Sequence, residues 1–367
     1  METDASSSNR ILAIDVFRGL TMFLLVGEFT GFSSFLTHEA LDGSILSMIG
    51  HQFHHHPWNG LRFWDLIQPF FMFIVGLSLP FAVSNRMKKG DNTQQIFRHI
   101  LKRSAILLLL GWGLSCISSA KITFYFQNVL AQIAFTYLIA YLIMNRSIKF
   151  QLLFSLGLLL LTEALYRFFP LEGFNHPFVA NENFGTWLDL QYGGANLSGH
   201  WVSINALPTA AHTIWGVIVG KLFMSDKSAQ EKVKQLFIAG LALVVAGYLL
   251  DFVTPIIKRI ATSSFVIVSG GWSILAIAFL YWLVDIKQLN GRWTLFFGVV
   301  GMNSLFIYLF AHVGGVKFIE PILHPFTYAI FDWGGGLTAP IVTSLLVWAA
   351  LWGICYWMYK RRLFIKI

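Results

Sequence analysis

The side chains best suited to chemistry in this sequence are four histidines within six residues: His51, His54, His55 and His56. Imidazole titrates near neutral pH without perturbation, so a histidine here can act as a general acid or base. Adjacent histidines rarely point at one metal ion, and no nearby cysteine or evenly spaced carboxylate completes a ligand set. We therefore expect acid–base chemistry from one histidine and no metal. A solvated loop without a chemical role and a metal site are the two alternatives.

The residues that follow the histidines are of the types found at the rim of a sugar-binding site. Pro57 and Trp58 make the segment rigid and aromatic, and an indole ring can stack on a sugar. We assign Trp58 and its neighbour Asn59 to the substrate site. Asp65 opens the next apolar run, where its carboxylate can cap the free N–H groups of a helix. Asp65 is therefore interpreted either as a helix cap or as a further member of the substrate site.

Three ionisable residues lie inside the first apolar segment, where charge is costly and marks either function or a paired structural charge. Asp15 and Arg18 are three residues apart, so they share a helical face and can neutralise each other. In the functional interpretation Arg18 offers a bidentate guanidinium to an anionic ligand, and both residues belong to the substrate site. Glu28 lies ten residues further on. We expect this carboxylate to have a catalytic partner or to be a boundary residue that touches water.

The composition indicates the kind of elements that must position these residues. Of 367 residues, 56% are hydrophobic and 12% are charged, whereas soluble domains carry about 25% charged residues. This balance excludes a water-soluble globule and predicts that much of the surface faces lipid. The net charge of +8 is expected to reflect basic cytoplasmic loops rather than nucleic-acid binding. Cys116 and Cys355, the two cysteines, allow no disulfide framework and no paired-cysteine metal site.

The hydropathy pattern predicts an all-α polytopic membrane protein with about ten transmembrane helices, since a bilayer core needs about 20 mostly apolar residues per helix. We expect the first segment to be retained rather than cleaved, because Asp15 and Arg18 interrupt it. Residues 318–331 are interrupted by Pro321 and Pro325 and are interpreted as re-entrant or interfacial, with an eleventh helix as the alternative. The predicted spans are 11–36, 65–84, 100–119, 123–144, 150–169, 207–224, 235–253, 262–284, 293–313 and 338–358.

The distribution of basic residues predicts the orientation. With both termini in the cytoplasm, 19 lysines and arginines fall on the cytoplasmic side and six on the outer side, as the positive-inside rule requires. The histidine-rich loop at 37–64 and the long loop at 170–206 then face outward. We treat residues 1–367 as a single integral-membrane domain. No internal repeat is evident, which weakens a transporter interpretation built on duplicated halves.

Two stretches carry a resemblance to a known family: IDVFRGLTMFLLV in the first segment and HHPWNGLRFWDLIQPFFMFIVGLSLPFA in the second. They resemble the signature of the heparan-α-glucosaminide N-acetyltransferase family, a branch of the transmembrane acyltransferases. Weaker matches follow in order at 262–285 (TSSFVIVSGGWSILAIAFLYWLVD) and 301–312 (GMNSLFIYLFAH). The similarity runs along most of the chain, with high specificity in residues 10–85.

The resemblance implies an activity and a catalytic residue. Members of that family transfer acetyl from cytosolic acetyl-CoA to the amine of a terminal glucosamine across the membrane. Their catalytic histidine lies three residues before the tryptophan of H-x-x-W-N-G-L, which is His55 here, whereas His54 and His56 do not fit that spacing. We also assign Asn303, in the last matched stretch, to the substrate site.

The sequence departs from the family pattern at two positions. The family often has an asparagine where this chain has Phe29, with Glu28 beside it, and this difference suggests a bacterial-type subgroup. Relatives commonly carry an arginine within GVLQRIA, where this chain has the neutral Gln132. Some contacts to the phosphates of the acyl donor are therefore expected from elsewhere. We expect a small amino sugar as the acceptor rather than a glycosaminoglycan polymer, for which the given sequence offers no binding segment.

These observations lead to one hypothesis of mechanism. His55 acts as general base and removes a proton as the acceptor amine attacks the thioester carbon, while Glu28 orients the imidazole or holds the amine. The basic cytoplasmic rim, with Arg18 as its deepest member, attracts the CoA phosphates. Acetyl-CoA is thus a co-substrate, and the other partners are a small amino sugar and the lipid bilayer. We expect a bacterial inner-membrane protein with the His55 loop toward the periplasm.

Several alternatives stay open at the level of sequence. His55 can itself be acetylated in a covalent relay. A protein of another class, a transporter of amino sugars or lipid-linked sugars, would also suit the helices and the buried charges. O-acetylation of a surface glycan shares the donor and differs in the acceptor. The sequence leaves open whether the protein forms a homodimer.

Overall fold

The computed structural model describes residues 11–365, and within this range the chain is helical, apart from one isolated β-bridge between Asn196 and Trp201. The expected all-α class is confirmed. Arg10 and Lys366, two of the basic residues that we placed on the cytoplasmic side, lie outside the described residues.

The helices differ widely in length, from one turn to more than six. The single turns are the 3₁₀ segments η1 (Glu39–Leu41), η2 (Phe63–Leu66), η3 (Ser203–Asn205) and η6 (Asp332–Gly334), and two π segments are η4 (Tyr281–Ile286) and η5 (Ala311–Gly315). The α-helices are α1 (Leu12–Glu28), α2 (Phe32–Leu36), α3 (Ile45–Gln52), α4 (Ile67–Lys88), α5 (Thr93–Ser119), α6 (Val129–Ile143), α7 (Ile148–Arg167), α8 (Phe184–Gln191), α9 (Ala206–Met224), α10 (Ala229–Leu250), α11 (Ser263–Leu280), α12 (Arg292–Met302), α13 (Ser304–Phe310), α14 (Val316–Phe331) and α15 (Thr338–Lys360).

Short polar side chains explain where several long helices begin. Asn92 accepts from the N–H of Gln95 at the start of α5, and the Gln95 side chain accepts from the N–H of Asn92. Ser228 and Glu231 form the same reciprocal pair at the start of α10. Such capping boxes satisfy N–H groups that the first helical turn leaves without partners.

In the described part of the chain, seven helical stretches are long and apolar enough to cross a membrane by length and composition. The ten predicted spans all fall on helices, but α1 has 17 residues and α6 has 15. The predicted spans 11–36, 123–144 and 207–224 are not among these seven stretches, so the count of ten stays a prediction. The seven stretches are Phe63–Lys88, Thr93–Ser119, Ile148–Arg167, Ala229–Leu250, Ser263–Ile286, Ser304–Gly334 and Thr338–Lys360.

The predicted span over 293–313 corresponds to a helical segment that begins at Arg292 but is interrupted inside. The helix breaks at Asn303, between α12 and α13, and the backbone kinks again at Gly314 (φ +125°), before α14 begins. Pro321 and Pro325 lie inside α14 without ending it. A proline removes one backbone donor and bends a helix. α14 packs against α15 along this stretch.

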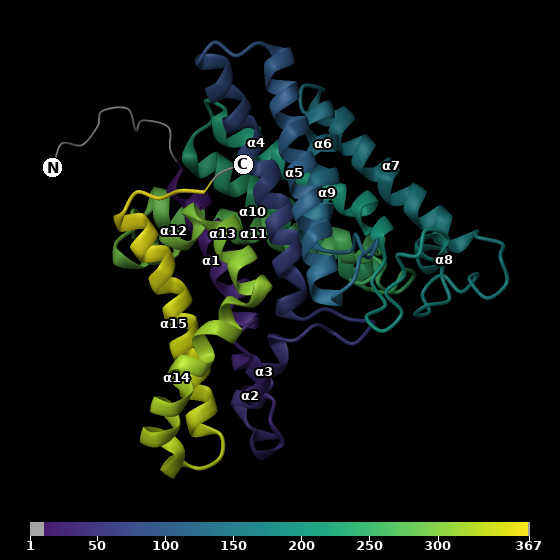
Figure 1. The fold of residues 1–367 in the computed structure, drawn as a ribbon. Helices are drawn as coiled ribbons and strands as arrows, with labels where there is room; N and C mark the ends of the chain where they lie inside the picture. The colour runs from purple at the N-terminus through teal and green to yellow at the C-terminus, as the bar shows by residue number, and fades with distance from the viewer. Residues whose placement is uncertain (1–10, 366–367) are drawn as a thin grey trace, which may run out of the picture.

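The helices around the site form one packed group. α4 packs against α9 and α6, and α1 contacts both α4 and α12. In Figure 1, α4, α5, α6, α7 and α9 lie on one side of the molecule, and α12, α14 and α15 lie on the other. α4 and α9 approach closely at Gly76, where an added Cβ would lie 1.9 Å from the carbonyl oxygen of Thr213. Glycine lets the two backbones approach, as small residues do in membrane helix pairs.

A second, smaller hydrophobic cluster fixes the loops at one end of this group. Its buried members come from α7, α8 and the segments before α9 and α11, and Trp58 packs against it. The loops that carry polar residues are therefore anchored by an apolar cluster of their own. Its buried members are Tyr166, Phe184, Val202, Ile257 and Ile260.

Candidate active site

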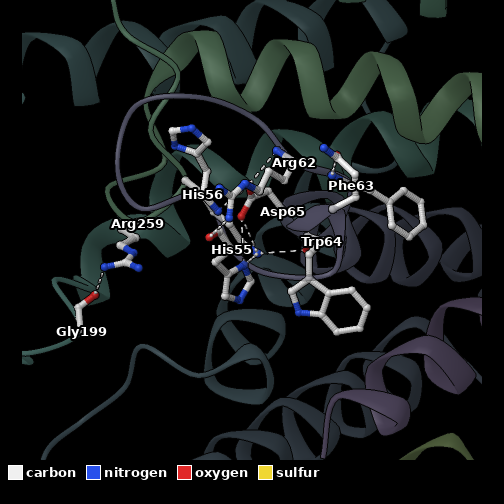
Figure 2. Close-up of polar contacts among 10 residues, drawn as sticks. His55, His56, Arg62, Phe63, Trp64, Asp65, Gly199 and Arg259 are labelled. Carbon is white, nitrogen blue, oxygen red and sulfur yellow. Dashed lines mark hydrogen bonds and ion pairs between the residues drawn. The ribbon is translucent and has the colours of Figure 1, made fainter. Parts of the chain in front are cut away.

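The turn between α3 and α4 brings His55 and Asp65 together. The carboxylate of Asp65 closes this turn, because its Oδ2 accepts from the backbone N–H of Arg62 at 2.9 Å and of His56 at 3.2 Å. The Arg62 guanidinium donates to the carbonyl oxygen of His55 at 3.2 Å and braces the loop from the other side. Figure 2 shows these residues gathered at the loop. The capping role expected for Asp65 is thus present, in the turn η2 that leads into α4.

The other carboxylate oxygen of Asp65 contacts the imidazole. Asp65 Oδ1 lies 2.9 Å from His55 Nδ1, and the Asp65 side chain is 1% exposed while that of His55 is 31% exposed. A carboxylate at this distance requires a hydrogen on Nδ1, and the hydrogen bond of one ring nitrogen sets the state of the other. Neutral His55 therefore keeps a lone pair on Nε2. One residue serves both as a cap and as the partner of the histidine.

A third charged group, Lys258, completes the cluster, and sequence reasoning missed it. Its Nζ lies 3.1 Å from His55 Nδ1 and 3.7 Å from Asp65 Oδ1, and the side chain is 7% exposed. Burial lowers the pKa of Lys258 to about 8, although Asp65 and Glu28 oppose the shift. The signal in the sequence was the adjacent pair of basic residues, Lys258 and Arg259, on a side expected to carry few.

A backbone hydrogen bond joins the two loops that carry these groups. The N–H of Gly60 donates to the carbonyl oxygen of Ile256 at 2.8 Å, two residues before Lys258. Gly60 has φ +143°, and a Cβ there would meet the His56 ring at 2.6 Å. Only glycine adopts this conformation readily. The turn after the histidines thus depends on glycine to dock on the loop that carries the lysine.

The electrostatics of the cluster favour a neutral imidazole. Burial has the largest effect and lowers the pKa of His55, and the ammonium of Lys258 lowers it further. The hydrogen bond and the charge of Asp65, and the more distant charge of Glu28, act in the opposite direction without reversing the shift. At neutral pH His55 is therefore uncharged, the form that a base or nucleophile requires.

His55 and Lys258 face a cavity of about 780 Å³. Trp201 contributes an aromatic face, with its ring centroid 5.6 Å from that of His55 and edge-on to it. Glu28 lines the same cavity and is exposed. Polar groups that converge in one large pocket are the usual marks of a ligand site. Further polar lining residues are Gln68, Ser115, Ser118, Ser119, Tyr125, Gln127, Asn128, Asn196, Ser198, Tyr308 and His312.

Two residues assigned to the substrate site from sequence lie elsewhere. Trp58 donates its indole N–H to the carbonyl oxygen of Phe178 at 2.7 Å and packs on the second hydrophobic cluster. Asn59 is exposed. Neither residue is among those that line the His55 cavity. The tryptophans that line it are Trp64 and Trp201, and Trp201 comes from the long 170–206 loop.

A buried carboxylate in that long loop supports the cavity wall. Asp189 accepts from the amide nitrogen of Gln127 at 2.8 Å, from the hydroxyl of Tyr192 at 2.6 Å and from the N–H of Ser203 at 2.9 Å. Gln127 also donates to the carbonyl oxygen of Gly194 at 2.6 Å. These bonds tie the loop around Trp201 to the segment before α6, so the outer loop is part of the site.

Asp15 and Arg18 line a second cavity of about 750 Å³. Their side chains form an ion pair at 3.6 Å, and Arg18 also donates to the hydroxyl of Ser78 at 2.7 Å. Arg103 lines this cavity as well, with its guanidinium 5.0 Å from the centroid of the Tyr137 ring. The Nε of Arg103 is buried without a hydrogen-bond partner. The second cavity therefore has two guanidinium groups in its wall.

Asn303 lies beside the second cavity but bonds to the backbone. Its amide nitrogen donates to the carbonyl oxygen of Leu363 at 3.0 Å, and its Oδ1 accepts from the N–H of Ile365 at 3.1 Å. Its neighbours Met302 and Ser304 line the cavity, while Asn303 itself does not. Asn303 thus holds the C-terminal segment against the break between α12 and α13.

A narrow cavity of about 120 Å³ lies between the other two. It shares Leu25, Phe71, Val129 and Tyr308 with the His55 cavity. Its other wall, shared with the second cavity, consists of Arg18, Ile74, Val75, Arg103, Ser304 and Leu305. The three spaces therefore follow one another through the helix group, with a mostly apolar constriction between two polar ends.

Gln132, the position where the sequence departs from the family pattern, is buried at the edge of this path. Its amide oxygen accepts from Gln68 and its amide nitrogen donates to the carbonyl oxygen of Gln127 at 3.2 Å. Gln68 and Gln127 both line the His55 cavity. Gln132 thus supports two cavity residues. Among residues 11–365, no group of three or more histidine, cysteine or carboxylate side chains could hold a metal ion.

The catalytic-domain model of heparan-alpha-glucosaminide N-acetyltransferase matches residues 10–250 of this chain, which is well over half of it. The chain belongs to this family. The match confirms the resemblance that the helix-one and histidine-loop motifs predicted. It covers Arg18 and the His55–Asp65 pair and ends before Lys258.

Two curated members of the family show the extent of local similarity. The heparan-alpha-glucosaminide N-acetyltransferase of Mus musculus is 31% identical over 110 residues, which are 30% of this chain and 14% of the relative. The Homo sapiens protein of the same name is 28% identical over 102 residues, 28% of this chain and 13% of the relative. The matched segments thus span about one seventh of these relatives.

Proposed function

We propose that this protein transfers acetyl from acetyl-CoA to the amine of a glucosamine-type sugar, with His55 as the general base. The observation that carries the proposal is the path of three cavities, which has guanidinium groups at one end and the free Nε2 of His55 at the other. Family membership supports the reaction class, and the geometry supports the assignment of roles to residues.

Acetyl-CoA would lie along this path with its phosphates at the Arg18–Arg103 end and its thioester at the His55 end. The Arg18 and Arg103 guanidinium groups would receive the CoA phosphates, since a guanidinium binds phosphate through bidentate hydrogen bonds. The unpartnered Nε of Arg103 supplies a buried donor that a phosphate oxygen can satisfy. The slender pantetheine arm would pass the narrow cavity beside Phe71 and Leu25. This placement brings the thioester to His55.

The proposed chemistry needs one base and one acceptor. The neutral amine of the sugar attacks the thioester carbon, and His55 Nε2 takes the proton that the nitrogen loses. The carbon–sulfur bond then breaks, the acetyl group stays on the amine, and CoA leaves as thiolate that the imidazolium can protonate. A route through acetyl-His55 uses the same free Nε2, since the acyl group would form its bond there.

The acceptor would bind on the side of the cavity formed by the outer loop. Trp201 offers an aromatic face, and the carboxylate of Glu28 can hold the amino group before it reacts. Asn196 and Ser198, from the same loop, offer hydrogen bonds to sugar hydroxyls. We therefore assign sugar stacking to Trp201, and we assign to Trp58 the anchoring of the loop.

The proposal includes an orientation across the membrane. Both termini and the Arg18–Arg103 end face the cytoplasm, where acetyl-CoA is made available. The loops at 37–64 and 170–206 face the opposite side, which in a bacterial inner membrane is the periplasm. The asymmetry of basic residues supports this arrangement.

Purified protein in detergent tests the proposal. Thiol release from acetyl-CoA is measured with glucosamine, with a sugar that has only hydroxyl groups, and without an acceptor. The expected result is release that depends on the amino sugar and yields its N-acetyl product. Release with both sugars would favour an O-acetyltransferase. The absence of release with either sugar, together with uptake of the sugar into vesicles, would replace the enzyme with a transporter.

A further inference from the structure

We propose that Lys258 is a positioning residue for His55: its buried ammonium keeps the imidazole neutral beside an ionised Asp65, with the proton on Nδ1 and the lone pair on Nε2. The inference rests on the proposed function in treating His55 as the base. It adds a third member to the His55–Asp65 pair, from a loop 203 residues after His55 in sequence.

The positions of the hydrogens follow from the distances. Asp65 Oδ2 accepts two backbone N–H bonds and Oδ1 lies near an ammonium, and these contacts favour the carboxylate form. With Asp65 ionised, the 2.9 Å contact between Oδ1 and His55 Nδ1 needs a hydrogen on Nδ1. Lys258 therefore cannot donate to Nδ1, despite the 3.1 Å separation. Its effect on the imidazole is that of a nearby positive charge.

This charge changes what Asp65 does to the histidine. A carboxylate alone favours imidazolium, which lacks the lone pair that a base needs. The ammonium 3.7 Å from the same carboxylate oxygen offsets that effect, because it repels a second positive charge on the ring. Asp65 can then orient the ring without holding it in the protonated form. In this cluster Asp65 sets the orientation of the imidazole, and Lys258 sets its protonation.

The surroundings of Lys258 are built for a cation. Its ammonium lies 5.6 Å from the centroid of the Trp201 ring and 3.5 Å from the carbonyl oxygen of Trp64. A buried ammonium requires such partners, since an unpaired one is costly. The same Trp201 ring lies edge-on to His55. Lys258 is thus held by the residues that also surround the imidazole.

Other charged groups lie around the His55 loop on several elements. Glu28 on α1 favours the imidazolium, and Arg62, whose guanidinium donates to the His55 carbonyl, is a second cation near the loop. The Arg259 guanidinium lies 5.9 Å from the centroid of the Trp201 ring, and His56 is the residue next to His55. Among these groups Lys258 is the cation that contacts the His55 ring. Its removal is therefore the most direct change to the protonation of the base.

The test is a titration of His55 that needs no substrate. Diethyl pyrocarbonate modifies neutral imidazole, and mass spectrometry of the loop peptide gives the extent for His55 separately from His54 and His56. In Lys258→Met the midpoint pH of His55 modification should rise by about one unit, the size of effect typical of a neighbouring charge. Lys258→Arg keeps the charge and should leave the midpoint near that of the wild type. Well above both midpoints, wild type and Lys258→Met should be modified to the same extent, because the imidazole is then neutral in both.

The matched control is Lys232→Met, which removes a second buried lysine whose ammonium bonds to the carbonyl oxygen of Phe223 on α9, away from the cavities. It should leave the His55 midpoint unchanged. If Lys258→Met does not give a monodisperse protein, Lys258→Gln has the same expected outcome.

Two results would overturn the inference: a His55 midpoint in Lys258→Met equal to or below that of the wild type, or one that also rises in Lys258→Arg. The measurement contains no acetyl-CoA, so its failure differs from a failure of the proposed function, which the thiol-release assay reports. In the active enzyme, the acid limb of the pH profile of kcat/KM should shift to higher pH in Lys258→Met, by the same amount as the midpoint of His55 modification. A uniform loss of activity at every pH would indicate a purely structural lysine.

Discussion

Asp65 Oδ1 lies 2.9 Å from His55 Nδ1, and the other oxygen of the same carboxylate closes the turn that carries the histidine. The position of the base is thereby coupled to the start of α4, which crosses the helix group. A residue expected to cap a helix also orients the proposed base. Several of the following predictions depend on this double role.

Alanine variants of the three histidines should show that His55 contributes more to kcat than His54 or His56. His55→Ala is expected to lower kcat by about 10²-fold or more, the range for loss of a general base. His54→Ala should have a smaller effect, because the His54 ring contacts Thr37 at 3.4 Å and does not line the cavity. His56→Ala is a second control. Equal losses in all three variants, reversed by added divalent metal, would contradict the assignment and favour a metal site.

Asp65→Asn should lower kcat by about 10²-fold or more, because an amide can present its NH₂ to Nδ1 and so favour the tautomer that lacks the Nε2 lone pair. The control is Asp285→Asn. Asp285 also caps a helix with both oxygens, at 2.9 Å from the N–H groups of Leu12 and Ala13, but lies away from the His55 cavity. Loss of capping alone would lower the melting temperature of both variants, whereas kcat should fall steeply only for Asp65→Asn. Similar kcat losses in both variants would leave Asp65 with a structural role.

Glu28→Gln tests the remaining carboxylate of the cavity. Glu28 raises the pKa of His55, so its neutralisation should move the acid limb of kcat/KM to lower pH. If Glu28 also holds the acceptor amine, KM for the sugar should rise while KM for acetyl-CoA stays constant. The measurement is a pH series with each substrate varied in turn. An unchanged acid limb and an unchanged sugar KM would remove Glu28 from the site.

The two tryptophans of the outer loops should give opposite results. Trp201→Ala removes the aromatic face beside His55 and should raise KM for the sugar about tenfold, with little change in melting temperature. Trp58→Ala removes a ring packed in the second hydrophobic cluster and should lower the melting temperature. Kinetics and thermal unfolding of both variants check this. A raised sugar KM in Trp58→Ala alone would restore the role first assigned to Trp58.

Cysteine labelling checks the orientation in a background in which Cys116 and Cys355 are replaced by serine. A cysteine at Ser198 should react with a membrane-impermeant thiol reagent added from outside. A cysteine at Asn92 should react only after the membrane is permeabilised. The reverse pattern would place the His55 cavity on the cytoplasmic side.

The sequence was sufficient for features that depend on local pattern. Runs of apolar residues identified the helices, since a bilayer demands a minimum length of apolar chain, and the structure confirms the all-helical class. The spacing of His55 to Trp58 and the motif around Arg18 pointed to the family, and the family match over residues 10–250 confirms it. These signals lie within short stretches of chain and need no knowledge of packing.

Where helices end inside apolar segments was less predictable. The helix breaks at Asn303, whose side chain bonds to the C-terminal segment, whereas α14 continues through Pro321 and Pro325. Hydropathy averages over such features, because a kinked helix and a straight one can have the same composition. The predicted span at 293–313 therefore did not include the break at Asn303.

The sequence by itself determined the membrane class, the family and the histidine loop, because each is encoded in residue types at short spacing. Only the tertiary structure decided that Lys258 and Trp201 join His55 and that Trp58 does not line the cavity. It also placed Asp65 on the imidazole. The physical reason is that the buried polar groups of this cluster find their partners across loops that hydrophobic packing brings together. Such partners can be far apart in the chain.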